Sequence, residues 1–98
     1  MIKYAAIAFH PITLEYGYAN DCSSREEAES EASRNLGSGY IIPAWVGDEG
    51  YAALARSPNG IYNGGNGQTL IEAEQDALHR CAARGGTDCY IMCSVYSG

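Results

Sequence analysis

Four cysteines, Cys22, Cys81, Cys89 and Cys93, are the residues of this 98-residue chain best suited to chemistry. An even number of cysteines in a short, glycine-rich domain is typical of disulfides that supplement a small hydrophobic core. A structural zinc site usually has paired cysteines roughly two to four residues apart. The spacing of Cys81, Cys89 and Cys93, with His79 nearby, does not match that pattern, so we expect disulfides and no metal or cofactor. Four cysteines allow three pairings, and their positions alone leave the choice open.

The remaining reactive side chains favour structural roles. His79 lies two residues before Cys81, which places the two side chains on different faces of a helix. Glu29 and Glu74 occupy matching places, but nothing apolar surrounds them in the sequence that would shift a carboxyl pKa. Residues 63–67, Asn-Gly-Gly-Asn-Gly, lack the lysine that a phosphate-binding loop needs. The sequence therefore predicts no catalytic residue and favours a non-catalytic protein.

Comparison of the chain with itself shows two copies of one unit. Residues 4–8 read Tyr-Ala-Ala-Ile-Ala, and residues 51–55 read Tyr-Ala-Ala-Leu-Ala. Further along, the segments that match in the same order are residues 24–29 with 69–74 and residues 40–42 with 90–92. A unit of about 47 residues is too small to bury its own apolar face. We therefore expect the two copies to share one core.

Each copy predicts the same elements, in the order strand, turn, strand, helix, strand. The expected strands are residues 4–9, 14–19 and 40–46 in the first copy and 51–55, 61–66 and 89–96 in the second. Helices are expected after Ser24 and Thr69, because each is followed three residues later by a glutamate, as in a capping box. Pro43 predicts that its strand is an edge or bulged strand. The glycines of residues 63–67 indicate a bulge, a close backbone approach or a loop.

The expected fold is α+β, with two pseudo-symmetric β-β-α-β repeats at residues 4–47 and 51–96 that form one domain over residues 1–98. Its sheet is mainly antiparallel and carries two helices. A formal net charge of −6 argues against a nucleic-acid-binding protein. The longest mainly apolar stretch, residues 40–46, is too short to span a membrane.

The second copy carries a combination of motifs that resembles a known family. These motifs are Tyr-Ala-Ala-Leu-Ala at residues 51–55, the capped, alanine-rich segment at residues 69–81, and Gly-Gly-Thr-Asp-Cys at residues 85–89. Together they resemble the bacterial domain of unknown function 4189, over nearly the whole chain. The first copy departs from the family pattern, because Leu36 stands where a cysteine is expected. The resemblance implies an exported, often disulfide-bonded protein without an established catalytic activity.

The resemblance also implies a pairing of the cysteines. The family's matching pair corresponds to Cys81 and Cys89, which leaves Cys22 and Cys93 for a second disulfide. Export implies an extracellular or periplasmic location. No signal peptide is recognisable after Met1, so two alternatives stay open. The chain is either a mature form with a replacement start methionine or a cytoplasmic protein with reduced thiols.

Two groups of residues, one aromatic and one acidic, are the candidates for partner binding. The unmatched aromatic residues are Tyr18, Trp45 and Tyr96, and aromatic side chains dominate binding hot spots. The acidic candidates in the first half are Glu26, Glu29 and Glu31, which favour a partner with a basic surface. We therefore expect a protein-binding domain, in a specific form an inhibitor or immunity-type protein. The alternatives are a small hydrolase-like enzyme with a cleft between the repeats and an envelope-associated structural protein.

Overall fold

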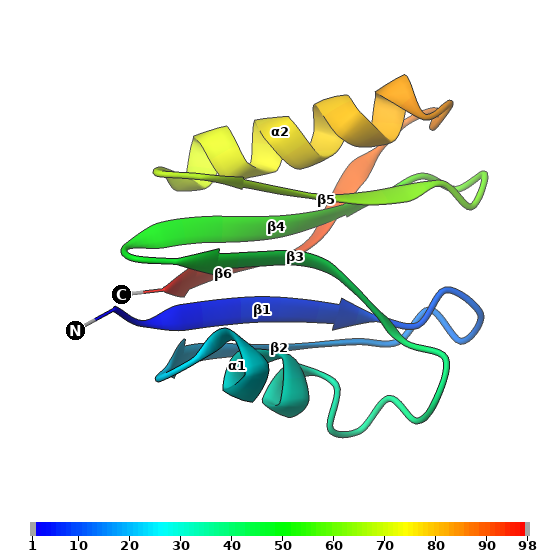
Figure 1. Ribbon diagram of the computed structural model, residues 1–98. Helices are drawn as coiled ribbons and strands as arrows, with labels where there is room; N and C mark the ends of the chain where they lie inside the picture. The colour runs from blue at the N-terminus through cyan, green and yellow to red at the C-terminus, as the bar shows by residue number, and fades with distance from the viewer. Residues whose placement is uncertain (1, 98) are drawn as a thin grey trace.

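Each copy of the repeat folds into a three-stranded antiparallel sheet with one helix (Figure 1). The computed structural model describes residues 2–97. The first repeat consists of β1 (Tyr4–Phe9), β2 (Tyr16–Cys22), α1 (Arg25–Ala32) and β3 (Ile41–Gly47). The second consists of β4 (Gly50–Arg56), β5 (Tyr62–Gly67), α2 (Leu70–Ala83) and β6 (Tyr90–Ser97). The strand orders, β2-β1-β3 and β5-β4-β6, place the first strand of each repeat at the centre of its sheet. The predicted α+β fold with two β-β-α-β repeats is confirmed.

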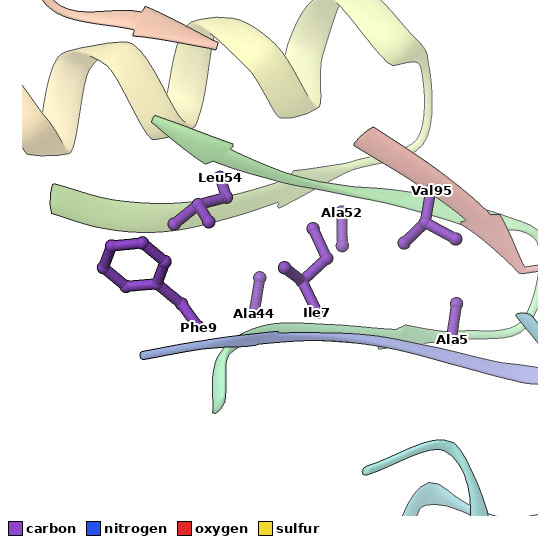
Figure 2. Close-up of a cluster of buried hydrophobic side chains, with 7 residues drawn as sticks. All are labelled: Ala5, Ile7, Phe9, Ala44, Ala52, Leu54 and Val95. Atoms are coloured by element: carbon purple, nitrogen blue, oxygen red, sulfur yellow. The ribbon is translucent and has the colours of Figure 1, made fainter. Parts of the chain in front are cut away.

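The elements stack in four layers, with the two sheets face to face and one helix on the outer face of each (Figure 1). The shared core lies between the sheets and is built from both repeats (Figure 2). The first repeat contributes Ala5, Ile7, Phe9 and Ala44, and the second contributes Ala52, Leu54 and Val95. The Phe9 and Tyr62 rings, one from each repeat, lie 5.0 Å apart between their centroids. Neither repeat could bury this apolar face alone.

The alanine-rich sequence of β1 and β4 follows from burial on both faces. Side chains alternate along a strand, so in β1 Ile7 points to the other sheet, whereas Ala6 and Ala8 point to α1. In β4, Leu54 points to the other sheet and Ala53 points to α2. Small side chains on the outer face let each helix lie close to its sheet. A continuous apolar run is expected for a strand that is covered on both faces.

Both helices begin where their capping residues predict. Thr69 accepts a hydrogen bond from the Glu72 backbone N–H at 3.1 Å, and the Glu72 carboxylate accepts one from the Thr69 backbone N–H at 3.2 Å. Ser24 accepts the matching bond from Glu27 N–H at 3.1 Å. The Glu27 carboxylate, however, accepts from the backbone N–H of Ser23 at 3.2 Å. The capping box is therefore complete only in the second repeat.

The strand of Pro43 is both an edge strand and a bulged one. β3 pairs only with β1, so it forms one edge of its sheet. The register with β1 shifts between Ile7 and Phe9, beside Pro43. Proline cannot donate to a strand ladder, which accounts for both features. β2 begins at Tyr16, later than the predicted 14, because Leu14 has a φ of 66° and still belongs to the turn.

Candidate functional site

A hollow of the surface lies where the two repeats meet. β3 of the first sheet and β5 of the second lie close together on the same side of the molecule. A groove of about 510 Å³ opens there, which we call the inter-repeat groove. It is lined by Trp45, Val46, Gly47, Asp48, Gly50, Asn66, Gly67 and Gln68. The lining residues thus come from the end of β3, the β3–β4 connection, the start of β4 and the end of β5.

One wall of this groove is formed by β5, a glycine-rich strand with few side chains. A Cβ at Gly64 would overlap the backbone of Pro43 in β3, and a Cβ at Gly65 would overlap the backbone of Ala77 in α2. A Cβ at Gly67 would lie 2.6 Å from the Glu72 Cβ. Among the three explanations that the sequence left open for residues 63–67, the structure selects close backbone approach. β5 is consequently packed on both faces by backbone rather than by side chains.

A smaller hollow of about 170 Å³ adjoins the groove and shares Trp45 and Asn66 with it. It adds Asp76 and Arg80 of α2 to the polar lining. The Asp76 carboxylate accepts a hydrogen bond from Arg80 Nε at 3.0 Å and another from the backbone N–H of Asn66 at 3.1 Å. Asp76 therefore already has partners. Among residues 2–97, no ion pair involves Asp48.

The Trp45 ring makes a cation–π contact with Arg25. The Arg25 guanidinium lies 4.2 Å from the ring centroid, and its Nε donates to the Glu29 carboxylate at 2.7 Å. On the same face of the sheet, the Tyr4 ring centroid lies 6.5 Å from that of Trp45. The ring's negative face accounts for the attraction to a guanidinium. Glu29 thus neutralises the cation that covers Trp45 and is not an isolated acidic group.

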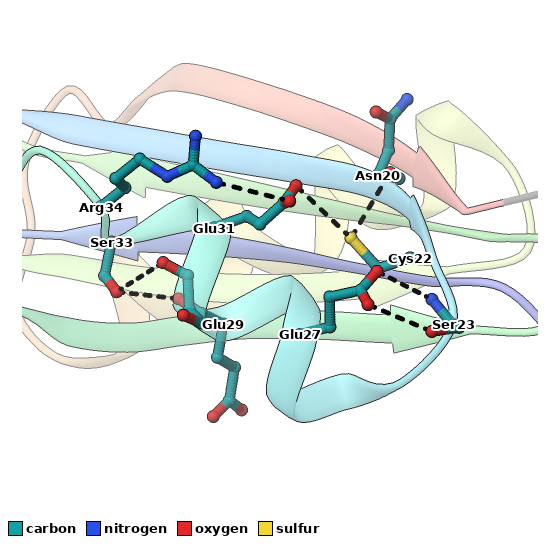
Figure 3. Close-up of polar contacts among 9 residues, drawn as sticks. Asn20, Cys22, Ser23, Glu27, Glu29, Glu31, Ser33 and Arg34 are labelled. Carbon is teal, nitrogen blue, oxygen red and sulfur yellow. Dashed lines mark hydrogen bonds and ion pairs between the residues drawn. The ribbon is translucent and has the colours of Figure 1, made fainter.

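The six predicted partner-binding residues do not form one patch. Tyr18 lies on β2 and Trp45 on β3, at opposite edges of the first sheet, whereas Tyr96 lies on β6 and packs against Tyr51 at 4.7 Å. On α1, Glu29 and Glu31 point in opposite directions (Figure 3). Glu31 is paired with Arg34 at 3.5 Å. The remaining candidate, Glu26, is an exposed residue in the first turn of α1.

Cys81 and Cys89 are brought together under the C-terminal end of α2. A Cβ at Gly86 would lie 2.9 Å from the Cys81 Sγ and 2.7 Å from the Cys89 Sγ, so both sulfurs lie against the same glycine. Both are free thiols in the structure, and their disulfide stays a prediction.

Cys22 and Cys93, also free, lie in different layers. Cys22 packs between the first sheet and α1, whereas Cys93 packs at the margin of the core between the sheets. This geometry lends no support to a Cys22–Cys93 bond.

The thiols of Cys22, Cys81 and Cys93 lie in surroundings that raise their pKa values. Burial raises the pKa of Cys93 to about 12. Burial also raises the pKa of Cys81 to about 12, with a smaller contribution from the hydrogen bond with Cys89. The pKa of Cys22 is raised by burial and then by the nearby Glu31 carboxylate, which lies 4.0 Å from its sulfur (Figure 3). A thiol that stays protonated at neutral pH is a poor nucleophile and a poor metal ligand.

Comparison with known proteins identifies the family of the chain. The model of the Domain of unknown function (DUF4189) matches residues 4–95. The chain belongs to the DUF4189 family. No curated protein and no solved structure matches it. Within residues 2–97 of this DUF4189 domain, no helix is long and apolar enough to cross a membrane. The same residues contain no cluster of three or more histidine, cysteine, aspartate or glutamate side chains that could hold a metal ion.

The two histidines of this DUF4189 domain differ in setting, and the buried one has a structural role. His10 Nδ1 accepts backbone N–H groups of Ile12 at 3.2 Å and Thr13 at 3.3 Å, and Nε2 lies 3.0 Å from the Ser38 carbonyl oxygen. The imidazole therefore joins the β1–β2 turn to the loop before β3. Ser57 occupies the equivalent place in the second repeat and bonds Thr87. His79 is an exposed residue of α2.

Three polar residues of the groove, Asp48, Asn66 and Gln68, were not among the predicted site residues. The sequence placed Asn66 in the expected strand 61–66, and it gave no role to Asp48 or Gln68. The position of Asp48 between the two copies could have indicated it, because a residue in the connection between two repeats lies close to both of them. Asn66 and Gln68 gave no such signal, since their place depends on how one sheet stacks on the other.

Proposed function

We propose that this DUF4189 domain is an exported, non-catalytic domain that binds a protein partner, and that the inter-repeat groove receives a basic segment of that partner. Trp45 and Asp48, which line the groove together, carry the proposal. A lysine or arginine side chain gains from the Asp48 carboxylate, and Trp45, whose ring already carries the Arg25 guanidinium, adds contact area beside it. A basic toxin or hydrolase is the partner class that an inhibitor or immunity-type protein with such a groove would bind.

The polar lining of the groove supports a peptide-like ligand. Asn66 and Gln68 each present both hydrogen-bond donors and an acceptor, so they suit the backbone as well as the side chains of a bound segment. The glycines on either side, Gly47 and Gly67, leave backbone groups accessible for the same purpose. A volume of about 510 Å³ exceeds what one lysine side chain needs and accommodates a short segment.

The charge of the whole chain supports the same partner class. A net charge of −6 attracts a basic surface over long range and raises the rate of encounter at low salt. The adjacent Cys81 and Cys89 support export. In an oxidising compartment they would form a disulfide, which would stabilise the end of α2.

The test compares partner capture by the wild type with capture by Asp48→Lys and Trp45→Ala variants, using extracts of the native organism at low salt. We expect the wild type to retain one basic protein. The amount retained should fall about tenfold or more with Asp48→Lys, because the carboxylate is replaced by a positive charge that repels the partner. Asp88→Lys is the matched control. Asp88 has the same charge and, with a φ of 53° against 62° for Asp48, the same left-handed backbone, but lies outside the groove.

Two results would contradict the proposal. The first is repeated failure of the wild type to retain any partner at low salt. The second is a retained partner that Asp48→Lys and Asp88→Lys bind equally well, since its binding would then owe nothing to the groove.

A further inference from the structure

Three of the outward backbone groups of β5 are bonded by side chains around them. Arg84 Nη1 donates to the Tyr62 carbonyl at 3.0 Å, and Asn63 Nδ2 donates to the Gly64 carbonyl at 2.8 Å. The Asn66 N–H donates to Asp76 at 3.1 Å. An edge strand with unpaired backbone groups is a template for another strand, and such interactions block it. The free edge of β5 is therefore partly blocked.

β2 is the equivalent strand of the first repeat, and its edge lacks these caps. Arg84 and Asp76 belong to the 14-residue helix α2, whereas α1 has 8 residues and ends at Ala32. The C-cap residue of α1 is Ser33, where α2 has Arg84, and the Ser33 hydroxyl donates back to the Glu29 carbonyl at 2.9 Å rather than to β2. Glu31 stands at the position of Asp76, but its carboxylate pairs with Arg34. The shorter helix packs on one face of β2, where the Ala32 carbonyl lies against Gly17, but supplies no cap to its outer edge.

The register shows which groups of β2 face outward. The backbone N–H of His10 donates to the Glu15 carbonyl at 2.9 Å, which makes these two residues a hydrogen-bonded pair. Because such pairs alternate along antiparallel strands, Gly17 bonds inward to β1, and Tyr16 and Tyr18 direct their N–H and C=O groups outward. Within residues 2–97, no side chain bonds the backbone of Tyr16 or Tyr18.

Two exposed aromatic side chains accompany these open groups. Tyr18 is 59% exposed and Tyr16 is 44% exposed. They pair with Ile7 and Phe9, so both lie on the face of the sheet that looks toward the other sheet. An extended peptide that adds to a sheet edge needs main-chain hydrogen bonds and side-chain contacts. The unpaired backbone groups of β2 can supply the first, and the exposed tyrosines can supply the second.

We propose that the β2 edge receives an extended segment of a partner protein as an additional antiparallel strand, and that this segment carries basic residues at both ends. Glu15 and Asp21 flank β2 and provide the complementary charge. A second copy of the chain is a poor occupant. Antiparallel self-pairing centred on Tyr18 would set Glu15 of one copy opposite Asp21 of the other, and like charges directly opposite each other are destabilising.

The inference rests on the proposed protein-binding role but uses the opposite edge of the sheet from the inter-repeat groove, since β2 and β3 flank β1. The two surfaces can therefore be tested separately. The probe is the blocked peptide Lys-Thr-Val-Thr-Val-Thr-Val-Lys, and its matched control has glutamate in place of both lysines. Binding is measured by titration and by hydrogen exchange of the Tyr16 and Tyr18 amides.

Tyr18→Pro removes the outward N–H without affecting a bond to β1, and Tyr18→Ala removes the ring alone. We expect the lysine peptide to bind and to slow exchange of both amides by about tenfold or more. Tyr18→Pro should weaken binding about tenfold relative to Tyr18→Ala. Asp88→Lys, which changes the net charge but lies outside both surfaces, should bind the peptide as the wild type does. If Tyr18→Pro does not fold, a lysine peptide N-methylated at alternate residues replaces it and should fail to bind.

Four outcomes would overturn the inference. They are no binding of the lysine peptide, equal binding of the glutamate peptide, equal affinity of Tyr18→Ala and Tyr18→Pro, and a wild-type dimer that Tyr18→Pro dissociates. Peptide binding that is lost in Asp48→Lys but kept in Tyr18→Pro would also overturn it, by placing the peptide in the groove, and would leave the proposed function intact.

Discussion

Gly64 in β5 lies directly against the Pro43 carbonyl in β3, so a Cβ at residue 64 would overlap that oxygen and would also lie 2.8 Å from the Ala44 Cβ. This contact joins the two repeats beside the inter-repeat groove. It exists because β5 has no side chain at that point and because Pro43 belongs to a bulged edge strand. The distance between the sheets at the groove is thus set by backbone meeting backbone.

The first prediction concerns this contact. Gly64→Ala should lower the free energy of unfolding by about 2–3 kcal/mol, since the added methyl group must push two sheets apart. Urea unfolding followed by tryptophan fluorescence measures the change. Gly60→Ala is the control, because Gly60 has a φ of 93° and nothing within 4 Å of its would-be Cβ. Gly60→Ala should lower the free energy of unfolding by only about 1 kcal/mol, which is the cost of placing alanine at a positive φ. Equal losses for the two variants would show that Gly64 is not tightly packed.

The internal repeat made most of this fold predictable. Two copies of Tyr-Ala-Ala-aliphatic-Ala, each followed by a helix cap, define the order of elements and their sharing of a core. The sequence did not predict that the strands divide into two sheets, because a strand buried on both faces reads alike in either arrangement. Close approach at Gly64 could not be distinguished from a loop, since its reason lies in Pro43, far away in the sequence.

The candidate site was less predictable than the fold. Repeat comparison singled out Trp45, which lines both hollows, but gave equal weight to Tyr18 and Tyr96, which lie on other strands. The count of acidic residues on α1 suggested a charged surface. Two of those carboxylates are instead neutralised by Arg25 and Arg34 one turn along the same helix. Pairing at this spacing could have been recognised from the sequence.

A second prediction concerns the connection between the repeats. Asp48 and Glu49 have φ values of 62° and 60°, a left-handed conformation that costs residues with a side chain about 1 kcal/mol. Glu49→Gly should therefore raise the free energy of unfolding by about 1 kcal/mol. Glu49→Ala removes the same carboxylate but retains the strain, so it should give no gain. A stabilisation of equal size in both variants would trace the effect to charge rather than to backbone conformation.

A third prediction concerns the thiols beside Gly86. Mild oxidation of the folded protein should join Cys81 to Cys89 with the loss of two hydrogens, because their sulfurs already lie against the same glycine. Trypsin cleaves after Arg84, between the two cysteines, so non-reducing mass spectrometry should find two peptides held together until a reductant is added. The closed loop is short, and we expect a stabilisation of about 2–3 kcal/mol.

Cys81→Ser is the control for this bond. It should abolish the linked peptides and the stabilisation by oxidation together. Recovery of a Cys22–Cys93 linkage from protein that was oxidised while folded would contradict the structure, which places these residues in different hydrophobic clusters.

The last prediction is a pH dependence of stability in the fully reduced protein. Burial raises the pKa of Cys93 from 9.0 to about 12, so between these values the unfolded chain loses a proton that the folded chain keeps. Stability from this thiol is complete below about pH 9 and declines as the pH rises toward about 12. Cys93→Ala should therefore show a shallower fall in the free energy of unfolding over this range. Ser94→Ala keeps the thiol and should follow the wild-type slope. Identical slopes for wild type and Cys93→Ala would mean that Cys93 ionises as readily in the folded chain as in the unfolded one.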